Sequence, residues 1–278
     1  MFLADRMFGD GTAPGVVLSV AVMSSCTGCV GSDGNHEQTA QGVNANPPVG
    51  IVEGVVLLAE ETEVPSYDST PAPNQPEPPK SCSPPKILDH QPVHLTDGRG
   101  LENVVIGATD FKRAPKHKPA TRAVTIDDCR LSPQVIAATR GDTLRLTNNT
   151  DYPFLPELGT SQLLQTLLHR ETRDIALEQG GVLKLGCGFA AECGRTDVMV
   201  FYHPVHAISG KAGKFRMVNV PADEDVKLHA WHPLFEEAIQ TVRVKPGQTV
   251  RVTFVLRPVE APAKVAVTPT DSAGARRP

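Results

Sequence analysis

The residues most able to do chemistry in this sequence are cysteines and histidines that lie close together in its second half. Cys187 and Cys193 are separated by five residues, and His203 and His206 follow three residues apart. Thiolates and imidazoles are ligands of soft transition metals, whereas two nearby cysteines in an oxidising compartment pair as a disulfide. The spacing therefore allows either a metal site or a disulfide.

The flanking residues predict two strands around this cysteine loop. In the stretch VLKLGCGFAAECGRTDVMVFYHPVH, apolar residues lead into Cys187. After Cys193, two sets of side chains alternate: Val198, Val200 and Tyr202 in one set, and Met199, Phe201 and His203 in the other. Such alternation is typical of β-strands. We expect a unit of strand, cysteine loop and strand over residues 182–206.

The histidines are weak ligand candidates. His203 and His206 are three residues apart, as are His229 and His232. On a strand, this odd spacing places the two members of a pair on opposite faces, so neither pair clamps a metal unless it lies in a turn. We expect these rings mainly to bond turn backbone, and we keep His203, His206 and His232 as weak candidates. The motifs of nucleotide-binding loops, zinc proteases and serine hydrolases do not occur, so we expect no enzyme.

Composition favours an all-β protein. The 278 residues include 25 Pro and 23 Gly, and long helical periodicity is rare, which favours short strands and turns. This length allows two small domains. The net charge of -4 argues against a nucleic-acid partner.

The N-terminal region, residues 1–29, predicts an export signal. An apolar run, PGVVLSVAVM, is followed by small residues and then by Cys26 and Cys29. This order resembles a bacterial lipoprotein signal, which implies cleavage and lipidation at Cys26 or Cys29. A buried strand of a cytosolic domain is the alternative interpretation.

Six cysteines occur in the chain, so four remain if the first two belong to the signal. An even set in an exported chain predicts two disulfides, with three possible connectivities. Cleavage before Cys29 leaves no odd thiol, whereas cleavage before Cys26 leaves one. A four-cysteine zinc site is a weak rival because the body lacks any C-x2-C spacing. The four are Cys82, Cys129, Cys187 and Cys193.

The rest of the chain alternates between strands and polar or proline-rich segments. We expect a flexible tether at 30–49, a proline-rich excursion at 60–85 and a disordered tail at 259–278. Strands are expected in GIVEGVVLL, LENVVIGAT, RAVTI, PQVIAAT and DTLRLTN. Leucine spacing predicts one helix over 161–170, and a basic loop, FKRAPKHKPA, spans 111–120. Four further short strands after residue 206 have the alternation of an antiparallel sandwich.

Several segments together resemble a known family. They are CRLSP, GDTLRLTNN, the cysteine loop, YHPVHAISGKAGKFRMVNVP and AWHP. In this order they are similar to bacterial plastocyanin-like (methylamine-utilisation type) cupredoxin proteins with a C-terminal carboxypeptidase-regulatory, transthyretin-like segment. The resemblance implies a cupredoxin-like domain over 50–206 and a small β-sandwich segment over 207–258.

The family's type 1 copper ligands are largely missing from this chain. The family has a histidine after the Asn-rich strand end, where this chain has Phe154 and Pro156. Cys187 matches the family's thiolate, but Ala190 and Cys193 stand where the loop histidine and methionine are expected. One thiolate without imidazoles does not make a type 1 site. We therefore expect no cofactor, with copper in a rearranged site as the alternative.

The resemblance and the cysteine count lead to one hypothesis. We expect an all-β fold, with a degenerate cupredoxin-like Greek-key sandwich packed against a small antiparallel sandwich segment. The expected function is a non-enzymatic envelope scaffold or binding lipoprotein, and the alternative is a copper-handling or electron-transfer protein. Expected partners are the membrane, through the lipid anchor, and an unknown protein of the periplasm or outer membrane. The expected disulfides are Cys82–Cys129 and Cys187–Cys193.

Overall fold

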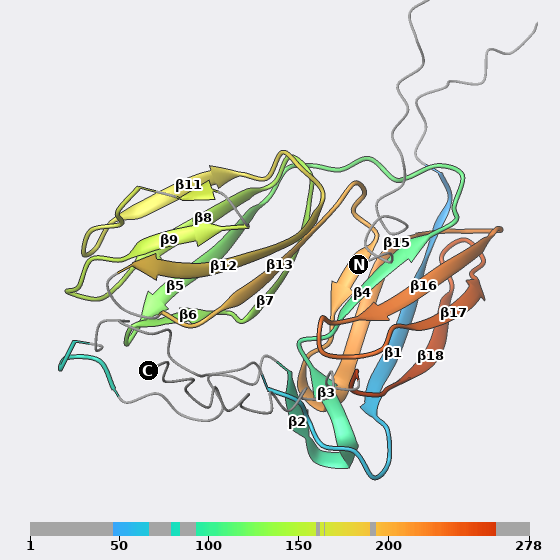
Figure 1. Cartoon of the computed structure of the whole chain (residues 1–278). Coiled ribbons are helices and arrows are strands. Elements are labelled where there is room, and N and C mark those ends of the chain that lie inside the picture. Colours follow the sequence, from blue (N-terminus) through green and yellow to red (C-terminus); the bar gives the residue numbers. More distant parts are fainter. Residues whose placement is uncertain are drawn as a thin grey trace, which may run out of the picture.

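The structure is a computed structural model, and it contains two β-sandwiches that lie side by side (Figure 1). It describes residues 47–66, 79–83, 93–159, 162–163, 165–189 and 193–259. The expected lipidation sites Cys26 and Cys29, and almost all of the expected tether and tail, lie outside these ranges. Within them the regular structure is strand and short 3-10 turns, and no helix is long and apolar enough to span a membrane. The all-β prediction is confirmed.

The first sandwich is built from residues 121–201. One sheet has the strand order β10-β9-β12-β13-β7, and the other has the order β11-β8-β5-β6. Leu144 and Leu146 from one sheet and Leu185 and Val198 from the other share one buried core. The strands are β5 (Thr121–Asp127), β6 (Arg130–Ser132), β7 (Val135–Thr139), β8 (Thr143–Asn148), β9 (Leu155–Leu158), β10 (Gln162–Leu163), β11 (Thr172–Ala176), β12 (Gly181–Phe189) and β13 (Thr196–Phe201).

The second sandwich is built from strands on both sides of the first in the sequence. One sheet has the order β15-β1-β3-β2, with β18 also paired to β1, and the other has the order β14-β4-β16-β17. Val52 and Phe254 from one sheet and Ile106 and Leu228 from the other share its core. The strands are β1 (Val49–Leu58), β2 (His94–Thr96), β3 (Gly100–Glu102), β4 (Val105–Thr109), β14 (His206–Ile208), β15 (Lys214–Pro221), β16 (Asp225–Trp231), β17 (Ala238–Arg243) and β18 (Thr249–Leu256).

This pairing corrects the expected division of the chain at residue 206. Strand β1 pairs antiparallel with β15 and parallel with β18, and β4 pairs antiparallel with β14 and β16. Residues 49–58 and 94–109 therefore complete the second sandwich, and the first is inserted between β4 and β14. The expected domain of residues 50–206 followed sequence order, whereas hydrogen bonding joins strands nearly 200 residues apart, such as Ile51 with Thr249.

The helix expected over 161–170 is wrong. Residues 162–163 form β10, which pairs antiparallel with β9, and Leu167 makes a β-bridge to Phe154. Leu167 is fully buried, whereas Leu168 is 58% exposed, so these two leucines do not share an apolar face. Backbone pairing with a neighbouring strand overrides the helical spacing of the leucines.

A small apolar core joins the two sandwiches. Val135 and Met199 of the first sandwich and Val105 of the second belong to one buried cluster. Phe201, at the end of β13, occupies the space above Gly107 of β4, where a Cβ atom would lie 2.5 Å from the ring. The sandwiches thus share a packed junction, and the sequence-predicted histidines lie around it.

Candidate functional site

The strands on either side of the cysteine loop form as expected, and the two cysteines of the loop are joined. Strand β12 carries Cys187, and a disulfide links it to Cys193 with the Cα atoms 5.5 Å apart. Cys193 is fully buried, and its carbonyl accepts a hydrogen bond of 2.8 Å from the amide of Leu131. The sulfur that would ligate a metal is therefore bonded to another sulfur.

The surroundings of Cys187 are apolar. Pro156 of β9 pairs with Cys187 across the sheet, and Phe154, two residues earlier, is fully buried. Both cysteines of the loop belong to or pack against the core of the first sandwich. These contacts suit a disulfide more than a charged metal centre, because an uncompensated charge is costly to bury.

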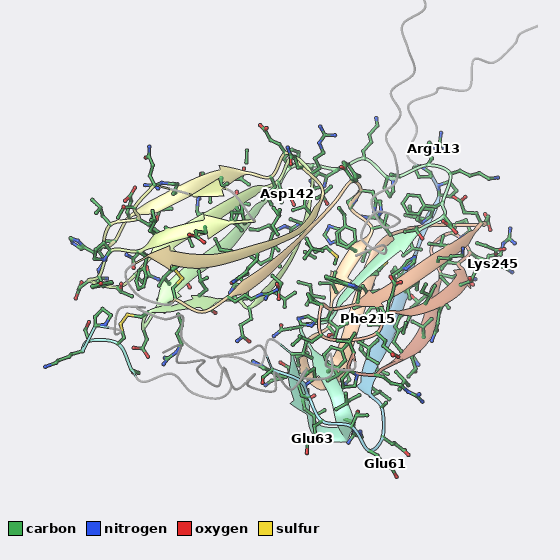
Figure 2. All side chains as sticks on the ribbon, in the orientation of Figure 1. Glu61, Glu63, Arg113, Asp142, Phe215 and Lys245 are labelled. Carbon is green, nitrogen blue, oxygen red and sulfur yellow. A yellow bond between two sulfur atoms is a disulfide. The ribbon has the colours of Figure 1, made fainter. Side chains whose placement is uncertain are left out.

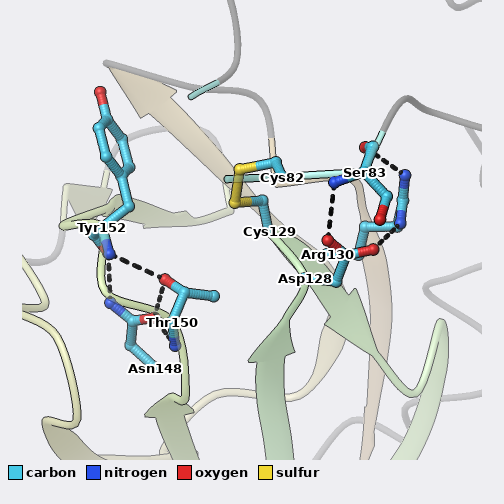
Figure 3. The surroundings of a disulfide bond; sticks show 8 residues. All are labelled: Cys82, Ser83, Asp128, Cys129, Arg130, Asn148, Thr150 and Tyr152. Carbon is cyan, nitrogen blue, oxygen red and sulfur yellow. Dashed lines mark hydrogen bonds and ion pairs between the residues drawn. A yellow bond between two sulfur atoms is a disulfide. The ribbon is translucent and has the colours of Figure 1, made fainter. Parts of the chain in front are cut away.

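The second disulfide also agrees with the prediction. Cys82 and Cys129 are joined, with the Cα atoms 5.6 Å apart (Figure 3). Cys129 and Asp128 form the two-residue turn between β5 and β6, and both have positive φ, as this hairpin turn requires. The bridge attaches the proline-rich excursion to that hairpin.

Polar contacts reinforce this attachment on the surface (Figure 3). The Ser83 amide donates to Asp128 Oδ1 at 2.7 Å, and Arg130 bonds both Asp128 Oδ2 and the Ser83 carbonyl. The hydrogen bond from the Ser83 backbone is the main cause that lowers the pKa of Asp128.

His203 lies in the bend after β13, where it has a structural role. Its Nδ1 accepts a hydrogen bond of 3.3 Å from the amide of Val205, and its ring packs edge-on against Phe111 at 4.9 Å. Burial lowers the pKa of His203 to about 4, opposed by a hydrogen bond to the Ala108 backbone. The Nδ1 atom of this candidate ligand is thus engaged by the backbone of its own turn.

His206 lies at the junction itself. Its ring stacks on Phe201 with a centroid distance of 4.8 Å, and its Nε2 lies 2.9 Å from Thr139 Oγ1 of the first sandwich. Burial, followed by the charge of Arg122, lowers the pKa of His206 to about 3. The imidazole therefore stays neutral and forms a hydrogen bond between the two sandwiches.

His232 repeats the local geometry of His203. Each is followed by proline, and His232 Nδ1 accepts a hydrogen bond of 3.2 Å from the amide of Leu234. Its Nε2 lies 3.8 Å from a carboxylate oxygen of Asp197, which is bound by Arg195. Burial, then the Arg195 charge, lowers the pKa of His232 to about 3. His203 and His232 both lie where the sandwiches join, each within its own turn.

The sequence analysis missed a buried carboxylate, Asp142, which is fully inaccessible to solvent (Figure 2). It accepts hydrogen bonds from the amides of Thr139 and Ala120, and it contacts His117 Nε2 at 2.7 Å and Arg122 Nε at 3.1 Å. Burial alone would raise the pKa of Asp142, but these bonds together lower it. Asp142 thereby fixes the linker between β4 and β5 to the first sandwich.

A second missed group is the buried chain Thr109–His229–Glu237. Thr109 Oγ1 lies 2.8 Å from His229 Nε2, and Glu237 Oε1 lies 2.8 Å from His229 Nδ1. The order hydroxyl, imidazole, carboxylate is that of a catalytic triad, yet it joins β4, β16 and the residues before β17 in one hydrogen-bonded chain. Sequence spacing carried no signal, because Thr109 and His229 are 120 residues apart.

Chemically, the junction is suited to holding the sandwiches together. His203, His206 and His232 each use at least one ring nitrogen in a bond within the fold. Among the described residues, no group of three or more His, Cys, Asp or Glu side chains could hold a metal ion.

The comparisons with known proteins give cupredoxins at low coverage. No protein-family model matches the sequence, and no curated protein matches it. An amicyanin variant in its reduced state is 18% identical, covers 34% of this chain and 97% of its own, and has a TM-score of 0.26. A purple cupredoxin from Nitrosopumilus maritimus is 19% identical, covers 28% and 97%, and has a TM-score of 0.24.

A copper-containing nitrite reductase from Thermus scotoductus is similar to the same degree. It is 16% identical, covers 33% of this chain and 24% of its own, and has a TM-score of 0.26. At these scores the likeness assigns no family, ligand or activity to this chain. The sandwich architecture stands on the strand pairing described above.

Proposed function

We propose that this protein is a non-enzymatic, envelope-associated scaffold or binding lipoprotein, with a cupredoxin-like sandwich that has lost its type 1 copper ligands. The observation that carries the proposal is the disulfide between Cys187 and Cys193. A blue copper site uses a cysteine thiolate and two imidazoles, and a sulfur held in a disulfide is not a thiolate. The buried Phe154 and the strand residue Pro156 stand where the family has a histidine.

The proposed location is the periplasm or the outer membrane, with a lipid on Cys26 or Cys29. Two disulfides support an oxidising compartment, since such bonds are rare in the cytosol. The apolar run before Cys26 supports export. The proposed partners are the membrane, through this anchor, and a protein of the envelope.

Metal analysis of the full chain, isolated from copper-supplied cells, tests the loss of copper. We expect no stoichiometric copper and no intense visible band, either as isolated or after copper is added to the oxidised protein. A blue band that disappears in both His203→Gln and His206→Gln would instead establish the rearranged copper site and overturn the proposal. His169→Gln, at an exposed turn position, is the matched control.

Intact-mass analysis of the membrane fraction tests the anchor separately. We expect a mature chain that begins at Cys26 or Cys29 and carries acyl mass. A chain that begins at Met1 or Met7 without added mass would defeat the lipoprotein part of the proposal.

A further inference from the structure

The linker between the two sandwiches exposes four cations within seven residues. Lys112, Arg113, Lys116 and Lys118 are all exposed, and we call them the basic linker surface. They lie in an irregular segment between β4 and β5, and this segment crosses from one sandwich to the other (Figure 1).

The side of the same segment that faces the protein interior is held at several points. The ring of Phe111 packs on His203, Pro115 is buried, and His117 and the Ala120 amide bond the buried Asp142. Because the inward-facing residues are held, the cations are displayed on an ordered part of the surface.

This surface lies at the end of the molecule where the described chain begins. The Lys112 amide donates to Glu224 Oε2 at 3.0 Å, and the amide of Ala222, two residues earlier, donates to the carbonyl of Pro48. Figure 2 shows Arg113 near the start of β1, with Lys245 at the same end. The described chain therefore begins beside the basic linker surface.

Two acidic groups at this end are paired with cations, whereas Glu224 and Asp223 keep their negative charge. Glu224 accepts from the Lys112 amide, Asp225 pairs with Arg243, and Asp110 pairs with Lys227 at 2.7 Å. Asp223 is exposed and adds one negative charge to the area. Even without Lys116, the cations Lys112, Arg113, Lys118 and Lys245 outnumber Glu224 and Asp223 and leave a positive excess there.

We propose that the basic linker surface docks on an anionic phospholipid membrane. This inference rests on the proposed lipid anchor, because the anchored segment would hold this end of the fold next to the bilayer. As a random coil, residues 30–46 of the expected tether would have an r.m.s. length of roughly 20–25 Å. A tether of that length lets the fold reach the bilayer surface. Once docked, the cations lie within about 8 Å of the lipid headgroups, which is the Debye length at physiological salt.

Vesicle co-sedimentation of the full chain with Cys26→Ser and Cys29→Ser tests docking without any lipid on the protein. We expect binding to vesicles of phosphatidylcholine mixed equally with phosphatidylglycerol, weak binding to phosphatidylcholine alone, and loss of binding at high salt. Each basic residue near an anionic surface strengthens partitioning by roughly fivefold. Reversing all four linker cations to Glu should therefore weaken binding by several hundredfold, on the order of 10²–10³.

A matched variant carries the same charge change elsewhere. Lys80, Arg170, Lys184 and Lys211 are exposed and lie outside the linker, and reversing all four to Glu should leave most of the binding intact. Equal binding by the two quadruple variants would overturn the proposal, as would equal binding to both vesicle types. Binding to duplex DNA without selective binding to phosphatidylglycerol would overturn it as well. Thermal melts check that both variants fold.

The outcomes separate docking from anchoring. If intact mass shows no lipid but the unlipidated chain binds phosphatidylglycerol through the linker, docking stands and anchoring falls. If the lipidated protein sediments with vesicles of either composition and linker reversal changes nothing, anchoring stands and docking falls.

Discussion

Acidification from pH 7 to pH 5 should destabilise the folded protein through its buried histidines. The folded-state pKa is about 4 for His203 and about 3 for His232, both below the ordinary value of 6.5. Below pH 6.5 the unfolded chain gains a proton on each ring, whereas the folded protein gains none until near pH 4 or pH 3. Stability is therefore complete above pH 6.5 and falls as the pH drops toward those values.

The expected size follows from the width of this pH window. Each pH unit inside the window costs about 1.36 kcal/mol per histidine, so each loses about 2 kcal/mol between pH 7 and pH 5. Together His203 and His232 should account for about 4 kcal/mol of the total loss. His206 is partly exposed, so solvent screening makes its contribution smaller.

Urea unfolding of the wild type, His203→Gln and His232→Gln at several pH values between 7 and 5 measures this effect. Each variant should lose about 2 kcal/mol less than the wild type over this range, whatever its stability at pH 7. His169→Gln, at an exposed position, should follow the wild type. If either buried-histidine variant loses as much as the wild type, that ring is not held neutral by burial and the reasoning fails.

The remaining predictions concern the two disulfides and the buried carboxylate. Cys82→Ser should lower the melting temperature more than Cys193→Ser, because closing 47 residues contributes roughly 4 kcal/mol and closing six roughly 2.2 kcal/mol by loop entropy; equal melting shifts in calorimetry would contradict this. Asp142→Asn should reduce the unfolding free energy by about 3–5 kcal/mol, as expected when one partner of a buried charge cluster is removed. In the same urea titration, Asp174→Asn, which breaks only an exposed pair with Arg145, should reduce the unfolding free energy far less than Asp142→Asn.

Local patterns predicted most strands, because alternation reports burial directly. In β18, Phe254 and Leu256 are buried, whereas Arg251, Thr253 and Val255 at the alternate positions are exposed, as the period of two requires. The disulfides could also be predicted from the sequence. The even number of cysteines and the missing copper ligands reduced the number of possible cysteine pairings. The strands needed only residue types and short-range order, whereas the disulfide pairing also depended on the resemblance to a copper-binding family.

Long-range pairing could not be predicted in the same way. The residues of GIVEGVVLL do not indicate that this strand pairs with β18. We therefore grouped the strand with its neighbours in the sequence, which placed it in the wrong sandwich. Asp142 was missed for the same reason: its importance depends on Ala120, Arg122 and His117, which are brought to it by folding. The leucines near residue 165 misled because their helical spacing competes with pairing that only the neighbouring strand β9 supplies.

The parallel pairing of β1 with β18 has a consequence for the order in which the molecule assembles. As the chain emerges from the ribosome, or from a translocation channel, residues 49–58 appear long before residues 249–256. The inserted sandwich has all of its strands before residue 202 and can close while β1 still waits with an unpaired edge. The last strand made thus completes the first sheet begun, and until then β1 presents an unpaired edge that a chaperone or another chain can bind.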